Sequence, residues 1–219
     1  MRTHRQNSFI KDPSLVLDLP LYLLDGSSIK DRSAYGHLGV VTGALWTLQG
    51  RSFDGVDDYV LIADTPSLNI LVAITIEAWV KLSSVTTYDV IVAKTSAAAG
   101  GESYEIFSDS AAKALMFLNP SATFTTTNVF YTVENWIHTV WTFSDADNKL
   151  MVYKNNVLFQ EWTTTEAMGS SAGNVGIGRR GDRGEHWFHG LIGEVRLYNR
   201  ALTAQEIQRN YLATKWRYR

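Results

Sequence analysis

Residues 135–163 read NWIHTVWTFSDADNKLMVYKNNVLFQEWT, and this stretch decides the fold class. Three runs rich in β-branched and aromatic residues are separated by Asp147-Asn148 and by Asn155-Asn156. Both pairs tolerate the positive φ angles that tight primed turns require. The stretch therefore predicts three consecutive antiparallel strands joined by two hairpin turns.

Similar short runs, bounded by Gly, Asn, Asp, Ser or Pro, recur along the whole chain. We expect strands at 15–24, 59–62, 74–82, 89–94, 103–108, 114–119, 136–144, 149–154, 157–163, 174–179 and 191–198. Thr203 followed by Glu206 is a capping box and predicts a helix over 204–213. Many short strands with one terminal helix indicate an all-β protein, a two-sheet antiparallel β-sandwich of the jelly-roll type.

The composition excludes several kinds of site and partner. The 219 residues contain no cysteine, which removes thiolate metal sites and cysteine nucleophiles. A net charge of −2 argues against nucleic-acid binding, and no apolar run is long enough to cross a bilayer. The first residues carry no apolar segment, so no signal peptide is visible. We expect a loose arm at 1–13, one sandwich domain at 14–213 and a basic tail at 214–219.

Large aromatic residues in the expected strands are candidates for the core. In the expected strand at 74–80, every second residue from Ile74 and Ile76 onward lies on one face, whereas Thr75, Glu77 and Trp79 lie on the other. Trp79, Trp136 and Trp141 are expected to fill the space between the sheets.

Several motifs together resemble one known family. They are LDGSSIKDRSAYGHLG at 24–39, SFDGVDDYVLI at 52–62, ITIEAWVKL at 74–82 and FHGLIGEVRLYNRALTAQEI at 188–207. In this order they look like the LamG-like jelly-roll modules of the concanavalin A-like lectin/glucanase superfamily. The resemblance covers about residues 15–212 and implies an exterior recognition module, extracellular or on a virion surface. It is specific for fold rather than function, because this fold hosts lectins, adhesion modules and enzymes.

The resemblance also implies one calcium ion, held by Asp31, Asp54 and the carbonyl of Gly193. Oxygen-rich turns suit Ca²⁺. Family members often carry a carboxylate where this chain has Gly193. The alternative is that these carboxylates only accept hydrogen bonds from turn amides.

No catalytic motif is recognisable. Glu102 and Glu105 form the one local acidic pair of the kind that glycosidases use, and a spacing of three in a strand places them on opposite faces. The sequence contains neither a GxSxG elbow nor HExxH. We therefore expect a protein that is not an enzyme.

The expected recognition residues lie mainly in one loop, which reads RRGDRGEHWFH at 179–189. An aromatic ring among fork-shaped donors suits glycan binding. The candidates are Arg179, Arg180, Asp182, Arg183, His186, Trp187, Trp162 and Tyr88. In the alternative, Trp187 and Phe188 tuck under the loop as a lid on the core.

Basic residues concentrate at both termini, where Arg2, Arg5, Arg217 and Arg219 predict a surface that docks the module onto a larger assembly. The leading interpretation is a lectin-like, calcium-supported module whose partner is a glycan or a surface protein. A structural or decoration protein of a virion or cell surface is the alternative, and a glycan-active enzyme is a third.

Overall fold

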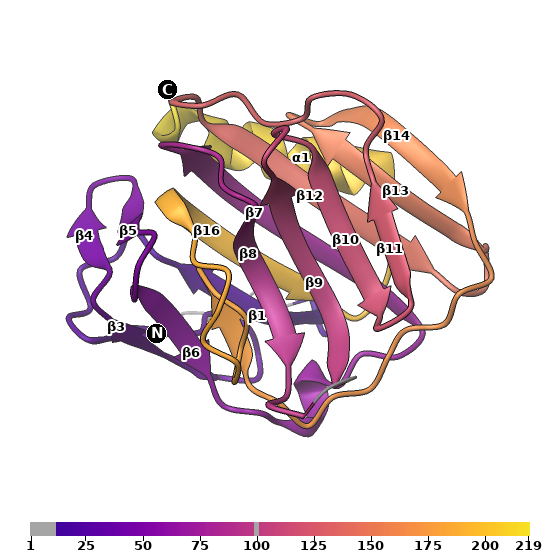
Figure 1. Cartoon of the computed structure of the whole chain (residues 1–219), viewed down its shortest axis with the longest axis horizontal. Helices are drawn as coiled ribbons and strands as arrows, with labels where there is room; N and C mark the ends of the chain where they lie inside the picture. The colour runs from indigo at the N-terminus through magenta and orange to yellow at the C-terminus, as the bar shows by residue number, and fades with distance from the viewer. Residues whose placement is uncertain (1–11, 99–100) are drawn as a thin grey trace, which may run out of the picture.

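The chain folds into two antiparallel sheets packed face to face, with one helix on the outside of the first sheet (Figure 1). The structure is a computed structural model and describes residues 12–98 and 101–219. The all-β sandwich with a single short C-terminal helix is thus confirmed.

The first sheet has the strand order β14-β13-β12-β7-β16-β5-β4, and β1 also pairs with β16. Its strands are β1 (Leu15–Pro20), β4 (Leu45–Thr47), β5 (Gly50–Asp54), β7 (Ala73–Leu82), β12 (Ile137–Ser144), β13 (Lys149–Lys154), β14 (Val157–Thr163) and β16 (His189–Tyr198). The two predicted hairpins are present, since β12 pairs with β13 and β13 with β14. In their turns Asn148, Asn155 and Asn156 have positive φ angles of 51°, 50° and 72°.

The second sheet has the order β11-β10-β9-β8-β15-β6-β3-β2. Its strands are β2 (Ser28–Lys30), β3 (Leu38–Thr42), β6 (Tyr59–Ile62), β8 (Tyr88–Thr95), β9 (Glu102–Asp109), β10 (Ala114–Asn119), β11 (Ala122–Thr125) and β15 (Val175–Ile177). The short strands β2 to β5 and β11 were not expected, since they lack long alternating runs.

The inner faces of the two sheets form one large core. Trp141 is fully buried there, beside Phe143 and Met116. Trp162 also faces this core, because its ring stacks on that of Trp141 at 5.7 Å. Trp162 is only half-buried against this core, and its expected role in ligand binding stays a prediction.

Helix α1 (Ala204–Thr214) covers the outer face of the first sheet and is followed by the 3₁₀ turns η2 (Lys215–Arg217). In Figure 1 the helix lies behind the strands β12 and β13. Trp79 is buried on this outer face, stacked on Tyr211 at 5.6 Å and on Tyr218 at 4.4 Å. Trp136 contacts Tyr218 as well. The expectation that Trp79 and Trp136 lie between the sheets was wrong, because α1 and the residues at its end bury Trp79 on the outer face and Trp136 is half-buried against Tyr218 there.

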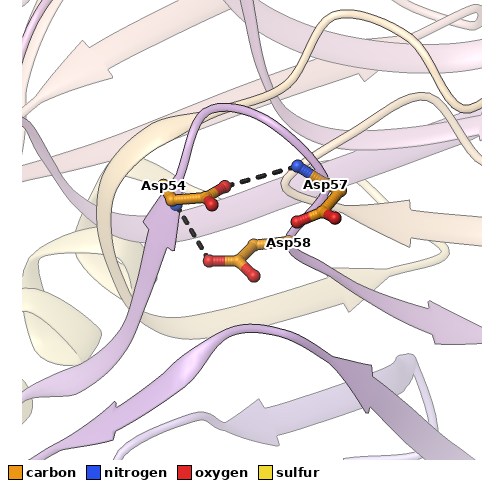
Figure 2. Close-up of side chains that lie close together, drawn as sticks. All are labelled: Asp54, Asp57 and Asp58. Carbon is orange, nitrogen blue, oxygen red and sulfur yellow. Dashed lines mark hydrogen bonds between the residues drawn. The ribbon is translucent and has the colours of Figure 1, made fainter.

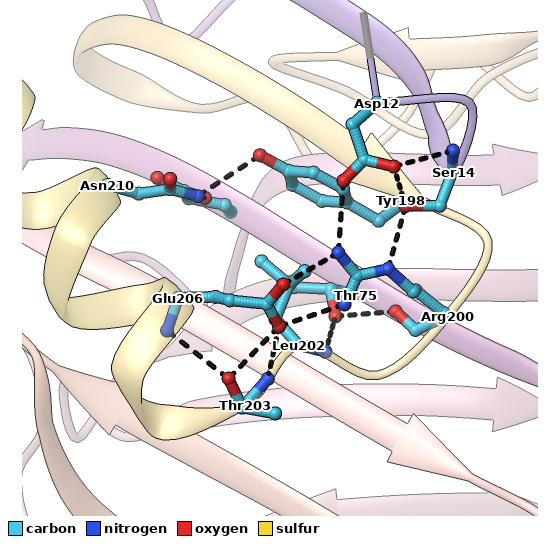
Figure 3. Close-up of polar contacts among 10 residues, drawn as sticks. Asp12, Ser14, Thr75, Tyr198, Arg200, Leu202, Thr203, Glu206 and Asn210 are labelled. Atoms are coloured by element: carbon cyan, nitrogen blue, oxygen red, sulfur yellow. Dashed lines mark hydrogen bonds and ion pairs between the residues drawn. The ribbon is translucent and has the colours of Figure 1, made fainter.

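Polar contacts join the segment before β1 to the start of helix α1 (Figure 3). Arg200 binds Asp12 and Glu206, and Thr203 and Glu206 form the predicted capping box. The expected basic tail at 214–219 includes η2 and the buried Tyr218, so part of it belongs to the fold. The expected arm lies mostly outside the described residues, as do Arg2 and Arg5.

Candidate functional site

Residues 179–187, here called the arginine loop, lie across the outer face of the second sheet. The loop follows β15 and contacts β8, where the Val90 amide donates to the His186 carbonyl at 3.2 Å. A Cβ atom on Gly176 would lie 2.6 Å from the Arg179 carbonyl oxygen. The glycine therefore lets the loop lie flat on β15.

Two of the loop's arginines are anchored by carboxylates of β9. Arg180 Nε lies 3.0 Å from both carboxylate oxygens of Glu105, and Arg183 Nη1 lies 2.5 Å from Glu102. Burial raises the pKa of Glu105 to about 7, although Arg180 opposes this shift. Arg180 and Arg183 fasten the loop to the sheet.

Glu102 and Glu105 were expected on opposite faces of their strand, and this was wrong. The β8–β9 register shifts between Lys94 and Thr95, which breaks the simple alternation. Both glutamates consequently reach the same loop, each held by its own arginine.

The arginine loop borders a surface hollow of about 410 Å³, here called the aromatic hollow. Its lining residues are Gly55, Thr86, Thr87, Tyr88, His186 and Trp187. Tyr88 is 39% exposed, and its ring lies 4.9 Å from that of His186. Burial, together with the charge of Arg180, lowers the pKa of His186, which favours a neutral imidazole at pH 7. The hollow thus combines aromatic faces with threonine hydroxyls.

Arg179 lies beside this hollow among aromatic rings. Its guanidinium carbon is 3.6 Å from the centre of the Tyr59 ring and 5.4 Å from that of Trp187. Within residues 12–98 and 101–219, no carboxylate pairs with Arg179, and its buried Nε has no hydrogen-bond partner. The Arg179 guanidinium is therefore held by aromatic rings rather than by a carboxylate, unlike those of Arg180 and Arg183.

The loop's remaining candidate residues have different environments. Asp182 accepts hydrogen bonds from the backbone and side-chain amides of Asn174. Trp187 is half-buried against Tyr59. Phe188 is fully buried in the core, at 6.0 Å from Phe53. Phe188, directly after the loop, thus covers the core, and Trp187 within the loop forms a wall of the hollow.

Three aspartates gather in the turn between β5 and β6, here called the acidic tip (Figure 2). One carboxylate oxygen each from Asp54, Asp57 and Asp58 lies within 4.8 Å of the others. The Val56 amide donates to Asp54 at 2.8 Å and lowers its pKa, whereas burial raises the pKa of Asp58. Three carboxylates fit the oxygen donors that Ca²⁺ takes, with water completing the coordination. The tip also contains Gly55, so it borders the aromatic hollow.

The expected grouping of Asp31, Asp54 and Gly193 is not formed. Asp31 accepts hydrogen bonds from the amides of Asp18, Ser33 and His37, which occupies its carboxylate in a turn before β3. The acidic tip lies at the opposite end of the β3–β6 pair.

Gly193 likewise lies away from the acidic tip. It packs against the ring of Tyr218, and a Cβ atom on Gly193 would lie only 2.3 Å from a carbon of that ring. Of the three residues, Asp54 alone belongs to a cluster of three carboxylates in the described part of the chain. Asp57 and Asp58 lie within the motif at 52–62 but were not selected as ligands, and sequence reasoning missed Tyr59, Thr86 and Thr87, which carry no motif of their own.

At the basic C-terminus, Arg217 stacks on Tyr22 at 3.6 Å and Trp216 is 62% exposed. Arg219 is exposed. No helix in the described part of the chain is long and apolar enough to cross a membrane.

Solved structures with the same fold include several binding domains. The binding domain of botulinum neurotoxin serotype G is 12% identical with a TM-score of 0.71, and the match covers 91% of this chain and 51% of that one. The binding domain of botulinum neurotoxin DC in complex with SialylT is 14% identical with a TM-score of 0.69, covering 92% and 51%. Trypanosoma rangeli sialidase is 17% identical with a TM-score of 0.70, covering 94% and 34%.

The chain therefore spans about half or less of the length of these structures, and at such identities the likeness concerns the fold. A search of curated protein sequences found no match. A family model described as the concanavalin A-like lectin/glucanases superfamily matches residues 54–208, from the acidic tip into helix α1. Because this match spans most of the sandwich, the chain belongs to that superfamily.

Proposed function

We propose that the protein is a non-catalytic, lectin-like module that binds a glycan in the aromatic hollow. The observation that carries the proposal is one hollow lined by Tyr88, Trp187 and two threonines, with Arg179 beside it, packed against the Trp187 ring. Aromatic faces stack on the C–H surface of a sugar, and the guanidinium and threonine hydroxyls can hydrogen-bond its oxygens.

Two further observations support a binding rather than a catalytic role. Glu102 and Glu105 are each held by an arginine, so this pair is not free to act as the acid and base of a glycosidase. Several proteins of the same fold are binding domains, one of them solved with N-acetylneuraminic acid and one with a synaptotagmin. An exterior location, facing glycans or surface proteins, would suit this role.

The proposal includes a calcium ion at the acidic tip, adjacent to the hollow through Gly55. Bound calcium would neutralise the three clustered carboxylates and stiffen one wall of the hollow. An ion present at 100 times its dissociation constant would add about 2.7 kcal/mol to the free energy of unfolding. Thermal unfolding with calcium and with EDTA tests this, and Asp57→Asn should remove the difference.

A glycan array on the purified chain, with and without EDTA, tests the binding. Trp187→Ala and Tyr88→Ala should each weaken binding about tenfold, or about 1.4 kcal/mol. Because Trp187 is only half-buried, its loss should cost about 1 kcal/mol of stability, and circular dichroism would confirm folding. Trp216→Ala, on the exposed C-terminal end, is the matched control. Unchanged binding in both hollow variants would exclude this hollow as the site.

A second candidate function is a structural or decoration role, docked through the basic termini. The exposed Trp216 next to Arg217 favours it, since an exposed indole ring beside a cation suits a partner surface. Light scattering decides between the two functions: a closed oligomer that Trp216→Ala dissociates would support this role, and a monomer would support the recognition module.

A further inference from the structure

A second hollow, of about 410 Å³, lies at the other end of the β3–β6 pair from the acidic tip. It is lined mainly by Tyr35, His37 and Leu38 on one side and by Ile62, Thr65 and Ser67 on the other. We call it the tyrosine hollow. Strand β3 runs from Gly39, near the tyrosine hollow, to Thr42, next to the acidic tip. These two residues are three steps, or about 10 Å, apart along the strand. The two hollows are thus distinct sites.

Two aromatic rings, here called the platform, stack on each other at the tyrosine hollow. The rings of Tyr35 and His37 are parallel to within 4°, with centres 6.1 Å apart. Gly36, between them, has a φ of +70°, the left-handed conformation that lets the chain turn sharply there. Tyr35 remains 45% exposed.

The platform is held rigidly although it is exposed. The Tyr35 hydroxyl donates to the Pro13 carbonyl at 3.2 Å, and the Tyr35 amide donates to Ser33 Oγ at 3.1 Å. His37 Nε2 lies 3.1 Å from Ser67 Oγ. An aromatic ring fixed at both its backbone and its hydroxyl has already lost the conformational freedom that ligand binding would otherwise remove.

Asp31 positions the segment that carries the two rings through hydrogen bonds. Its buried carboxylate accepts from the His37 amide at 3.0 Å and from the Ser33 hydroxyl at 2.6 Å. The residue that suggested a metal site in the sequence is therefore a positioning residue for the two rings.

The chemistry of the lining selects the ligand class. Of the described residues that line the hollow, none is Asp, Glu, Lys or Arg. The hydroxyls of Thr65, Ser67 and Tyr35 can donate and accept hydrogen bonds, as sugar hydroxyls require. An adjoining hollow of about 310 Å³ shares Ser67, contains the amides of Asn69 and Asn199, and is likewise lined by uncharged residues.

We propose that the tyrosine hollow is a second carbohydrate site, which takes an uncharged oligosaccharide stacked on Tyr35 and running past Ser67 into the adjoining hollow. The proposal does not depend on the aromatic hollow. Without an ionic contact its affinity would rest on stacking and neutral hydrogen bonds.

The test is an NMR titration of the isotope-labelled chain with three neutral probes, malto-, cello- and galacto-oligosaccharides, up to tens of millimolar. At least one probe should shift the amide signals of Gly36, His37 and Leu38. Tyr35→Ala should weaken the binding of that probe at least tenfold, whereas Tyr35→Phe should retain the binding because the ring face remains. Tyr88→Ala, in the aromatic hollow, should leave the affinity for that probe unchanged.

Ser67→Ala provides a second variant that keeps the platform and removes one hydroxyl, with an expected loss of about threefold to tenfold. Asp31→Asn should weaken the binding of the probe. In the free protein the Tyr35 and His37 signals should also broaden or move, as a positioning role of Asp31 requires. Absence of any shift with all three probes, or full binding by Tyr35→Ala, would overturn the proposal. Loss of binding in Tyr88→Ala with retention in Tyr35→Ala would assign neutral sugars to the aromatic hollow instead.

Discussion

At the residue scale, Glu77 links three elements on the outer face of the first sheet. Its carboxylate contacts His138 at 2.9 Å, Arg196 at 3.3 Å and Asn210 at 2.9 Å. Burial alone would raise its pKa, but the charge of Arg196 and the hydrogen bond from His138 outweigh burial and lower the pKa to about 2. The stability that this carboxylate contributes is therefore present above pH 4.5 and is lost as the pH falls towards 2.

We predict that Glu77→Gln costs about 3 kcal/mol at pH 7 and about 1 kcal/mol less at pH 4, because the unfolded wild-type chain then binds protons that the folded one does not. Urea unfolding at the two pH values measures both. Glu161→Gln, at an exposed position, is the control. An equal loss at pH 7 and pH 4 would show that shape, rather than charge, matters at this position.

At the scale of elements, helix α1 depends on its N-terminus as well as on its apolar face. Glu206 accepts from the Thr203 amide at 2.9 Å, and Thr203 Oγ accepts from the Glu206 amide at 3.3 Å. Thr203→Ala should cost about 1 kcal/mol and lower the melting temperature by roughly 2–4 °C. Thr203→Ser should retain most of the wild-type stability, and Thr165→Ala, in an exposed loop, should have no effect on the melting temperature. A melting temperature unaltered by Thr203→Ala would mean that tertiary packing alone holds the helix.

At the scale of the whole molecule, one core joins both sheets, so a single residue within it affects the whole fold. Trp141 is fully buried between them. Trp141→Ala should cost about 3–5 kcal/mol and shift one cooperative thermal transition downwards, without splitting it. Trp216→Ala, at 62% exposure, should leave the transition in place. Two separate transitions in the Trp141 variant would indicate that the sheets unfold independently.

Much of the fold was predictable because its signals are local. The asparagines in the two hairpin turns, the alternation along 74–80 and the Thr203/Glu206 cap each act within a few residues, and the structure contains all of them. The anchoring of the arginine loop was not predictable, because the partner of Arg180 lies 75 residues away in β9.

The sequence by itself determined the β-sandwich, its family and the terminal helix. Only the tertiary structure decided which strand faces are covered, and by what. Alternation places Trp79 and Ile76 on opposite faces of β7, but only the packing of α1 and η2 shows that both faces are buried. Likewise, Gly55, Tyr88 and Trp187 form one hollow because three distant loops meet there, a consequence of long-range strand pairing that no local pattern records.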